Sequence, residues 1–414
     1  MEASKIISGT CLKNLAGSSM IRKMFEEGIE LRKVHGNEVL DFTLGNPTLE
    51  PPHQFTEALA EIAAHPPANL HYYMPNSGHV SCRAAIAAAL TQWHGVNLTA
   101  DQLCMTVGAA GALVTLFKTL CEPGDEVITL APCFAEYASY MSHFGCVQKV
   151  CYPTATLDPD MGCLERIITD RTRCIVLNSP NNPTGHIYPV EVLKAMADLL
   201  TKKNQGRERP ILILCDEPYR RLVYQGFTCP SIMPLYPYTI IASSFSKDLS
   251  LPGERIGFIA VHPHIYSPTV MAGIATSLRQ LGYVNAPSLM QFAVERAVQS
   301  SIDMSWYQER RDLIYQAVVA AGLDCVEPSG AFYVFFKVPK GCTDAEMVAI
   351  LKRRLVLSVP GTGFKAPGFV RMAFCVPLDD IRRLAPRLKE AADEARAMVA
   401  ARTPRFLLAP QDSA

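Results

Sequence analysis

Short, continuously apolar runs alternate with helical patterns through the middle of this chain, and this alternation is what most restricts the fold. Runs of this kind suit strands that are buried on both faces of a sheet. They lie at residues 102–107, 126–130, 174–178, 211–216, 239–243 and 256–261. Helical spacing follows Gly108 and begins again at Pro189. A βαβα order predicts a mostly parallel sheet with helices on both faces.

The two ends of the chain predict a second, smaller α+β domain. Near the start, Ser18 or Ser19 could cap a helix whose apolar face is formed by Ile21, Met24, Phe25 and Ile29. Near the end, strand-like runs at 332–338 and 370–375 precede a helical pattern formed by Ile381, Leu384, Leu388, Ala391, Ala395 and Met398. We expect an N-terminal arm and part of the small domain at 1–45, a large domain at 46–289, and the rest of the small domain at 290–414. The tail at 403–414 is expected to be poorly ordered.

Composition excludes several classes of protein. Lys plus Arg and Asp plus Glu both number 39, so the neutral chain has no overall field that would attract nucleic acid. No apolar stretch approaches the roughly 18–20 residues that span a bilayer, and the first residues do not resemble a secretory signal. We therefore expect the 14 cysteines to be free thiols of a cytoplasmic protein. Neither C-x-x-C nor H-E-x-x-H occurs, so no metal site is expected.

The segment SSFSKDLSLPGERIG, residues 243–257, is the strongest chemical signal. A buried strand runs directly into Lys247, which must either be desolvated, with a lowered pKa, or be bonded covalently to another group. Ser244 and Arg255 lie close enough in sequence to hold the phosphate of an aldehyde that Lys247 has captured. The alternative is a surface loop with ordinary charges.

A carboxylate stands at the end of another predicted strand, in ILILCDEPYR. Ligands of open α/β sheets bind at the carboxyl ends of the strands, and a buried carboxylate needs a partner there. For Asp216, that partner could be a helix N-terminus, Arg220, or the protonated nitrogen of a heterocycle. The turn SPNNPTG at 179–185 follows a third strand, where it could aim an Asn amide at a ligand or serve only as a turn.

Small residues open a helix directly after a strand in TVGAAGAL, residues 106–113. Free backbone N–H groups at such a helix start can bind an anion, although the small residues could also serve only for close helix packing. The pattern is neither G-x-G-x-x-G nor G-x-x-x-x-G-K-[ST], which disfavours a dinucleotide site and a P-loop.

In order and spacing, these segments resemble the class I/II aminotransferases, the fold-type I group of pyridoxal-phosphate enzymes. The resemblance runs from Leu44 to Arg371 through LGNP, HYYMPNSG, VGAAGA, SPNNPTG, DEPY, SFSK with GERIG, SGAFY and VRMAF. Its most specific part is D-E-P-Y with S-x-S-K, 247 − 216 = 31 residues apart. It implies a large domain with a mostly parallel, seven-stranded sheet and helices on both faces, plus a smaller α+β domain from both termini.

The resemblance also implies how pyridoxal 5'-phosphate would be held. Lys247 would form the internal aldimine and Asp216 would pair with the pyridine nitrogen, while Asn182 and Tyr219 would bond the ring hydroxyl. Lys247, Asp216 and Tyr219 would be the catalytic residues. The remaining cofactor contacts would come from residues around the phosphate and the ring: Gly108, Ala109, Ala110, Ser244, Ser246, Arg255 and Phe134. Tyr73 would reach the phosphate of a neighbouring subunit, which makes a homodimer with shared active sites the expected assembly.

For the substrate, the resemblance implies that the Arg371 guanidinium binds the α-carboxylate in a bidentate manner, with Gly45 and Asn182 close to the same carboxylate. The implied reaction moves an amino group between an α-amino acid and a 2-oxo acid. A β-eliminating C–S lyase, a decarboxylase or a cyclopropane-carboxylate synthase on the same scaffold would use the same residues. A dicarboxylate substrate would need a second cation, for which Arg279 and His71 are candidates, and we expect a neutral or broad-range substrate instead.

Two unrelated classes fit the chain poorly. The effector domain of a transcription factor would need a DNA-binding domain before LGNP, where only some 40 residues stand. A nicotinamide dehydrogenase would need the glycine fingerprint that is missing. Two departures from the family pattern bear on the side-chain pocket: the short spacing from Phe364 to Arg371, and Cys133 beside the stacking position.

Overall fold

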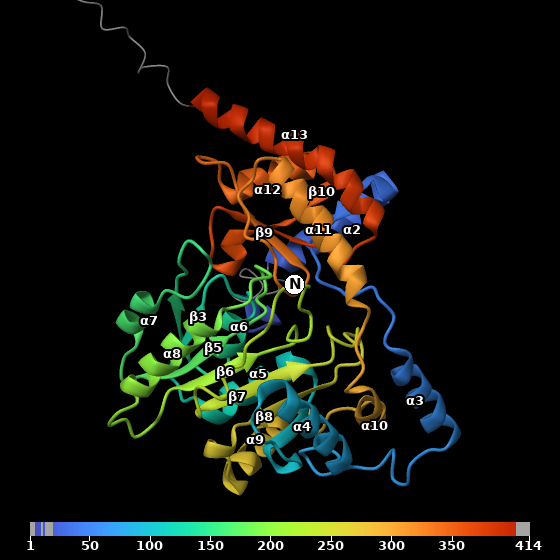
Figure 1. The fold of residues 1–414 in the computed structure, drawn as a ribbon, viewed down its shortest axis with the longest axis vertical. Helices are drawn as coiled ribbons and strands as arrows, with labels where there is room; N and C mark the ends of the chain where they lie inside the picture. The colour runs from blue at the N-terminus through green and yellow to red at the C-terminus, as the bar shows by residue number, and fades with distance from the viewer. Residues whose placement is uncertain (1–4, 10, 13–19, 403–414) are drawn as a thin grey trace, which may run out of the picture.

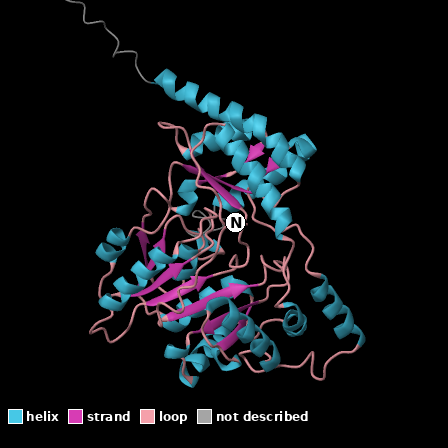
Figure 2. Cartoon of the chain, viewed as in Figure 1, coloured by secondary structure: helices cyan, strands magenta, loops and turns pink. Residues whose placement is uncertain are grey.

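The computed structural model describes residues 5–9, 11–12 and 20–402. Its larger part holds a sheet between helices, and a smaller part, with β9, α11, α12 and α13, stands on it (Figure 1). Figure 2 shows most of the strands in the middle of the larger part, with helices around them, and further strands in the smaller part. The proposed caps Ser18 and Ser19 and the tail at 403–414 lie outside the described residues.

The large sheet has seven strands, as the sequence predicts. In spatial order they are β2 (Leu103–Thr106), β8 (Gly257–Val261), β7 (Thr239–Ser244), β6 (Leu212–Asp216), β5 (Thr172–Leu177), β3 (Glu126–Leu130) and β4 (Val147–Cys151). β8 runs antiparallel to both of its neighbours and the other pairs are parallel. The predicted mostly parallel sheet is therefore confirmed.

In the large sheet, β4 is the strand that the sequence analysis did not find. It lies at the edge of the sheet, and most of its side chains are exposed or half-buried. An edge strand with Gln148 and Lys149 in it lacks the continuous apolar run that marks a strand covered on both faces.

Both faces of the sheet are covered, because alternate residues of one strand point to opposite sides. In β6, Ile213 and Cys215 belong to one core and Leu212 and Leu214 to another. The first core packs against α3 (His53–Ala64), α4 (Val80–His94), α7 (Met161–Ile167), α8 (Val190–Lys203) and α10 (Ser288–Ala297). The second packs against α5 (Gly108–Leu120), α6 (Tyr137–Ser142) and α9 (Pro268–Gln280).

The small domain combines both ends of the chain. Its elements are α2 (Met20–His35), β1 (Leu40–Asp41), α11 (Met304–Ala320), β9 (Tyr333–Lys337), α12 (Asp344–Arg353), β10 (Val356–Leu357), β11 (Val359–Pro360), β12 (Phe369–Ala373) and α13 (Leu378–Arg402). β11, β12 and β9 form an antiparallel sheet, and β1 pairs with β10. The predicted α13 face is buried from Ile381 to Ala395, with Met398 partly buried.

The predicted apolar face of α2 is wrong at Ile29, whereas the side chains of Ile21 and Phe25 lie outside the described part of the structure. Met24 packs in the small-domain core, whereas Ile29 is 45% exposed. The two residues lie five positions apart, which is about 500° around the helix, or 140° from each other. One narrow stripe therefore cannot bury both side chains.

A small apolar cluster joins the two domains. Leu157, in a loop of the large domain, packs against Phe335, Val359 and Phe364 of the small domain. The division at 1–45, 46–289 and 290–414 stays a prediction. In the structure the core changes between Val298, which packs with the large domain, and Ile302, which packs with the small one.

Three further observations concern whole classes of site. Within the described part of the chain, no helix has both the length and the apolar character needed to cross a membrane. All 14 cysteines fall in that part, and each of them is a free thiol. The described residues contain no group of three or more His, Cys, Asp or Glu side chains that could hold a metal ion.

Candidate active site

A cavity of about 290 Å³ opens where the parallel strands of the large sheet end. Most of the sequence-predicted site residues line it: Gly45, Ala109, Ala110, Phe134, Asn182, Asp216, Tyr219, Ser244, Ser246, Lys247, Arg255 and Arg371. Gly108, which precedes Ala109 at the start of α5, is not part of the lining, and Tyr73 lies elsewhere. Most of these residues are the last ones of β6 and β7 or lie in the segments that follow β2, β3, β5, β6 and β7, so the sheet itself brings them together.

Lys247 enters the cavity three residues after β7 ends. Its Nζ donates a hydrogen bond to the backbone oxygen of Gly45, at 2.8 Å, and lies 5.6 Å from the centre of the Phe332 ring. Burial lowers the pKa of Lys247 to about 8, and the nearby cations Arg255 and Arg371 act in the same direction. A lysine of this kind is partly neutral near physiological pH, and a neutral amine can act as a base or a nucleophile.

Asp216 is the last residue of β6 and is almost fully buried. Its Oδ2 accepts a hydrogen bond from the hydroxyl of Tyr137, and its Oδ1 has no hydrogen-bond partner among the described residues. Burial raises the pKa of Asp216 to about 7, against the opposing effect of the Tyr137 hydrogen bond. Of the partners considered from the sequence, Arg220 is excluded, because its guanidinium pairs with Glu217 at 3.5 Å.

Tyr137 was missed by the sequence analysis. It is the first residue of α6 and comes three positions after Phe134, whose ring it meets edge to face at 5.6 Å. Its role shows only in the hydrogen bond to Asp216, a residue 79 positions away in the sequence.

Arg371, in β12, brings a buried cation from the small domain. It is 1% exposed, donates to the backbone oxygen of Thr43 and to Asn182 Oδ1 at 3.2 Å, and leaves Nε without a partner among the described residues. The guanidinium lies 4.7 Å from the centre of the Tyr333 ring and 4.8 Å from that of Phe364. Burial lowers the pKa of Arg371, but an arginine still keeps its charge.

Tyr219 and Tyr333 link the two domains beside this arginine. Their hydroxyl oxygens are 2.9 Å apart, and their rings meet edge to face at 5.7 Å. Burial raises the pKa of Tyr333 to about 12, so this side chain remains a neutral hydroxyl. Tyr333 belongs to the SGAFY motif, yet the sequence analysis gave it no role.

The start of α5 forms a cradle for an anion. Gly108 has φ +70°, and a Cβ atom on it would lie 2.7 Å from the Arg255 guanidinium. A Cβ on Gly257 would lie 2.7 Å from the carbonyl carbon of Gly108. The two glycines thus allow a close approach that leaves the first N–H groups of the helix beside Arg255 and Ser244, which suits a phosphate.

Tyr73 does not reach the cavity of its own chain. Its side chain is 96% exposed and borders a separate hollow with His71, Tyr72 and Tyr283. His71 and Arg279, the two cations considered for a dicarboxylate substrate, do not line the central cavity, and both are exposed. Within one chain, therefore, neither is placed to bind a substrate.

The two departures from the family pattern meet in the structure. The backbone N–H of Cys133 donates to the backbone oxygen of Phe364 at 3.0 Å. Phe364 in turn lies against Arg371 and contacts Leu157 in the apolar cluster between the domains. The short loop before Arg371 is therefore held from the large domain.

The cavity fits a flat, phosphorylated heterocycle with a basic ring nitrogen. The unpartnered Oδ1 of Asp216 offers an acceptor to a protonated ring nitrogen, and the cradle at Gly108 offers N–H groups to a phosphate. Two charged residues of the lining then remain. Lys247 is suited to react with an aldehyde, and Arg371 is suited to bind a second anion, a carboxylate.

Comparisons with known proteins agree on one family. A family model described as aminotransferase class I and II matches residues 37–388. Aspartate/prephenate aminotransferase of Thermus thermophilus is 30% identical over 374 residues, 87% of this chain and 92% of that protein. The crystal structure of an amino transferase from Eubacterium rectale has a TM-score of 0.89 and 36% identity, and the match covers 94% of this chain and 99% of that one.

Aspartate aminotransferase from Thermus thermophilus, solved with maleate, has a TM-score of 0.81 and 29% identity over 90% of this chain and 97% of that one. The matches span nearly the whole length of both partners and agree with the predicted fold and family. The chain belongs to the class I and II aminotransferases and is an enzyme of that family.

Proposed function

We propose that this aminotransferase uses pyridoxal 5'-phosphate to move an amino group between a neutral or broad range of α-amino acids and a 2-oxo acid. The observation that carries the proposal is Asp216. Its Oδ1 is buried without a partner in the described chain, in the same cavity as Lys247 and Arg371. A buried acceptor of this kind calls for a donor from a ligand, and a protonated ring nitrogen is such a donor.

Different residues around the cavity would contact different parts of the cofactor. Asp216 would face the ring nitrogen, and Phe134 and Tyr219 would border the ring. Gly108, Ala109, Ala110, Ser244, Ser246 and Arg255 would surround the phosphate. When bound, pyridoxal phosphate supplies an aldehyde for the substrate amine and a ring that accepts the electron pair left on the α-carbon.

The chain's own residues would bind the substrate and move its proton. Arg371 would hold the α-carboxylate, with its free Nε and the Asn182 amide at hand. Lys247, with a pKa of about 8, can take a proton from the α-carbon and return it, and proton transfer of this kind contributes about 10²–10⁴-fold. Asp216 would keep the ring nitrogen protonated throughout.

The substrate side chain would meet apolar and aromatic groups. The charged residues that line the cavity are Asp216, Lys247, Arg255 and Arg371, and each already has a proposed task. No cation of the lining is left for a second carboxylate, which supports a neutral or broad-range substrate. Two of the compared proteins are named for aspartate, so the donor panel described below must include aspartate and glutamate.

The assembly we propose is a homodimer with shared active sites. Tyr73 and Tyr72 are 96% and 69% exposed in the single chain, an arrangement that favours burial against a second copy. Mixing Lys247→Ala and Tyr73→Ala subunits tests it: if Tyr73 acts across the interface, one site of the hybrid regains both groups and activity returns. Hybrids without activity would contradict the shared site. The free cysteines support a reducing compartment such as the cytoplasm.

One assay tests the proposed reaction. The purified enzyme, loaded with pyridoxal phosphate, receives one amino acid at a time and no 2-oxo acid. An aminotransferase releases one 2-oxo acid per site and stops until an acceptor is added. Continuous release of pyruvate and ammonia from cysteine-like substrates would instead identify a lyase. A panel of alanine, methionine, aromatic and acidic donors then ranks the substrates.

A further inference from the structure

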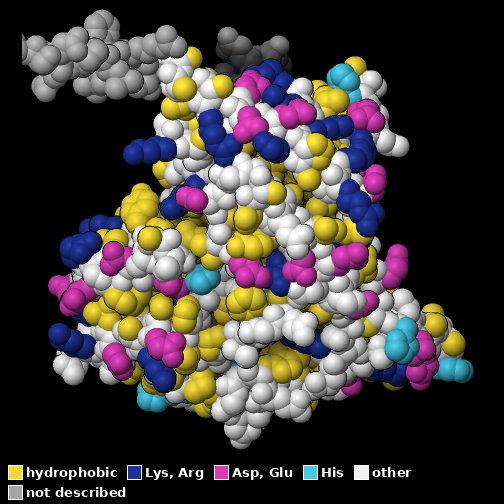
Figure 3. Space-filling view, turned by 45° about the horizontal axis from the view of Figure 1, so that its top comes forward, with side chains coloured by type: hydrophobic (Ala, Val, Ile, Leu, Met, Phe, Trp, Pro, Cys, Tyr) yellow, Lys and Arg dark blue, Asp and Glu magenta, His cyan; other side chains and the backbone are white. Residues whose placement is uncertain are grey.

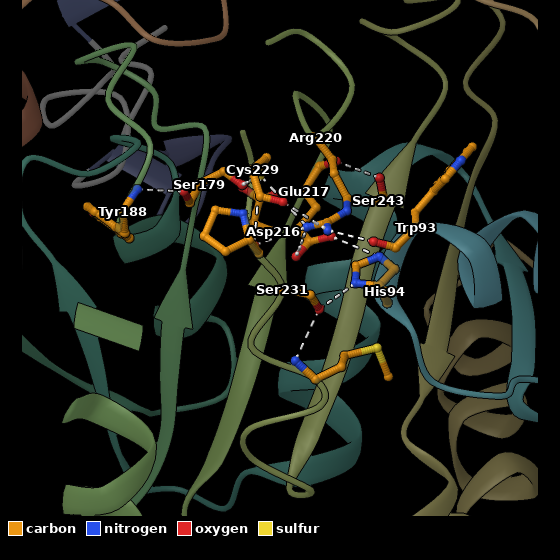
Figure 4. Close-up of polar contacts among 12 residues, drawn as sticks. Trp93, His94, Ser179, Tyr188, Asp216, Glu217, Arg220, Cys229, Ser231 and Ser243 are labelled. Atoms are coloured by element: carbon orange, nitrogen blue, oxygen red, sulfur yellow. Dashed lines mark hydrogen bonds and ion pairs between the residues drawn. The ribbon is translucent and has the colours of Figure 1, made fainter. Parts of the chain in front are cut away.

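Glu217 follows Asp216 directly but belongs to a different environment. It is 5% exposed and lines a small second cavity with Trp93, Arg220 and Ser243, rather than the central one. Successive residues at the end of a strand point to opposite sides. A second buried carboxylate therefore lies just behind the residue that we assign to the ring nitrogen (Figure 4).

Two side chains face the Glu217 carboxylate. Arg220 Nη1 lies 3.5 Å from Oε1, and His94 Nε2, at the end of α4, lies 3.4 Å from Oε2. Arg220 also donates to the backbone oxygens of Trp93, at 3.0 Å, and Cys229, at 3.3 Å. Through Arg220, the carboxylate is tied both to the last turn of α4 and to the loop that follows the strand.

The hydrogen bonds of His94 indicate which nitrogen carries its proton. Ser231 Oγ accepts from the backbone N–H of Met233 at 3.2 Å, so its own hydrogen is free to point at His94 Nδ1, 2.8 Å away. Burial lowers the pKa of His94 well below its usual value, so the ring is neutral. A neutral ring that accepts at Nδ1 carries its proton on Nε2, on the side of Glu217. Nε2 and Glu217 Oε2 lie 3.4 Å apart, and neither atom makes a hydrogen bond within the described residues.

The backbone between Asp216 and Glu217 is fixed from both neighbouring strands. Asn178 Nδ2 donates to the backbone oxygen of Asp216 at 2.7 Å. On the other side, the Glu217 N–H donates to the oxygen of Ala242 at 3.0 Å, and Ser243 Oγ donates to the oxygen of Glu217 at 2.9 Å. The Glu217 side chain adds the third anchor, toward α4, so the end of β6 has little freedom to turn.

We propose that Glu217 is a positioning residue that acts through Asp216: the Arg220–Glu217–His94 cluster fixes the end of β6 and places a negative charge behind the Asp216 carboxylate. The inference rests on the proposed function, in which Asp216 faces a protonated ring nitrogen. Burial raises the pKa of Glu217, and the nearby Arg220 guanidinium opposes this rise and favours the carboxylate. The negative charge of Glu217 raises the pKa of Asp216 in the free protein, and the same charge favours a cation beside Asp216.

A double-mutant cycle on cofactor affinity tests this. Four proteins are compared: the unchanged chain, Glu217→Gln, Asp216→Asn, and both changes together. The readouts are the dissociation constant for pyridoxal phosphate, from its visible absorption, and the melting temperature of the protein without cofactor. Residues that act through one another give non-additive effects. We expect Glu217→Gln to weaken binding by about five- to tenfold alone but by less than about twofold beside Asp216→Asn.

Kinetics give a second signature. With cofactor at saturation, Glu217→Gln is expected to lower kcat by about fivefold and to leave KM for the amino acid within about twofold, because Arg371 is held from the small domain. Glu191→Gln is the matched control. It makes the same chemical change at an exposed glutamate of α8, and it should alter none of these readouts.

The following outcomes would overturn the inference. If Glu217→Gln weakened cofactor binding equally with and without Asp216→Asn, Glu217 would have only a structural role. If the dissociation constant for pyridoxal phosphate did not change at all, Glu217 would have no part in cofactor binding. If the unchanged chain did not bind pyridoxal phosphate, the proposed function itself would fall. Should Glu217→Gln not fold, the pair Glu217→Met with Arg220→Met removes both charges together. That pair is still expected to weaken cofactor binding, and unchanged binding would contradict the inference.

Discussion

The large-domain and small-domain halves of the active site both hold desolvated charges, yet burial affects those charges differently. In the large domain, it brings the pKa of Lys247 down to about 8 and that of Asp216 up to about 7. In the small domain, it lowers the pKa of Arg371, but a guanidinium keeps its proton even there. The first half is therefore suited to proton transfer and the second to binding a fixed anion.

The largest effect is expected at Lys247. Replacing Lys247 with Ala removes the group that we assign to proton transfer, so turnover should fall by about 10²–10⁴-fold or more. Binding of a 2-oxo acid to Arg371, measured by calorimetry, should stay within about twofold of normal, because Arg371 is supported separately. Full activity in this variant would contradict the assignment.

The next effect concerns Asp216. Asp216→Asn keeps the shape but removes the negative charge beside the ring nitrogen. At saturating cofactor, kcat should fall by about 10²–10³-fold, the usual loss when one preorganised electrostatic partner is removed. The protein should still bind pyridoxal phosphate, with lower affinity. A variant that binds the cofactor and turns over normally would remove Asp216 from the chemistry.

Arg371→Lys tests the small-domain half. A lysine keeps the positive charge but loses the planar fork, so KM for the amino acid should rise by about 10–100-fold. The affinity for pyridoxal phosphate and its absorption spectrum should not change. If the spectrum changed and KM did not, the two halves would not be separate in the way described.

The smallest effect is a pH dependence of Lys247 in the protein without cofactor. The neutral amine is the reactive form, and its fraction rises about tenfold per pH unit below the pKa and levels off above it. Competitive labelling with acetic anhydride should therefore give a midpoint near 8 for Lys247. Exposed Lys194 of α8 serves as the control, an amine in water that is labelled in the same reaction. A midpoint above about 10 for Lys247 would show that it is not desolvated.

How far the sequence predicts the structure depends on whether a signal is local. The buried strands and the residues that follow them could be predicted, because continuous apolar runs and strand ends are local features. β4 could not, since an edge strand carries mixed side chains. Tyr137 and Glu217 were missed as well, because their partners, Asp216 and His94, are 79 and 123 residues away in sequence (216 − 137 and 217 − 94).

The surface sets a different limit. Figure 3 shows charged side chains of both signs spread over the visible face, consistent with a neutral chain. Mixed charges of this kind do not mark a binding site for a partner on the visible face. The exposure of Tyr73 acquires a meaning only through the family resemblance, and for that reason the dimer remains a proposal.

The most direct measurement is to load the protein with pyridoxal phosphate, reduce it with borohydride and map the modified peptide by mass spectrometry. Reduction fixes the cofactor to whichever amine has reacted with its aldehyde. We predict a single pyridoxyl-phosphate group on Lys247, and its loss in Lys247→Ala. A label on another lysine, or no label on a folded protein, would contradict the site described for this enzyme.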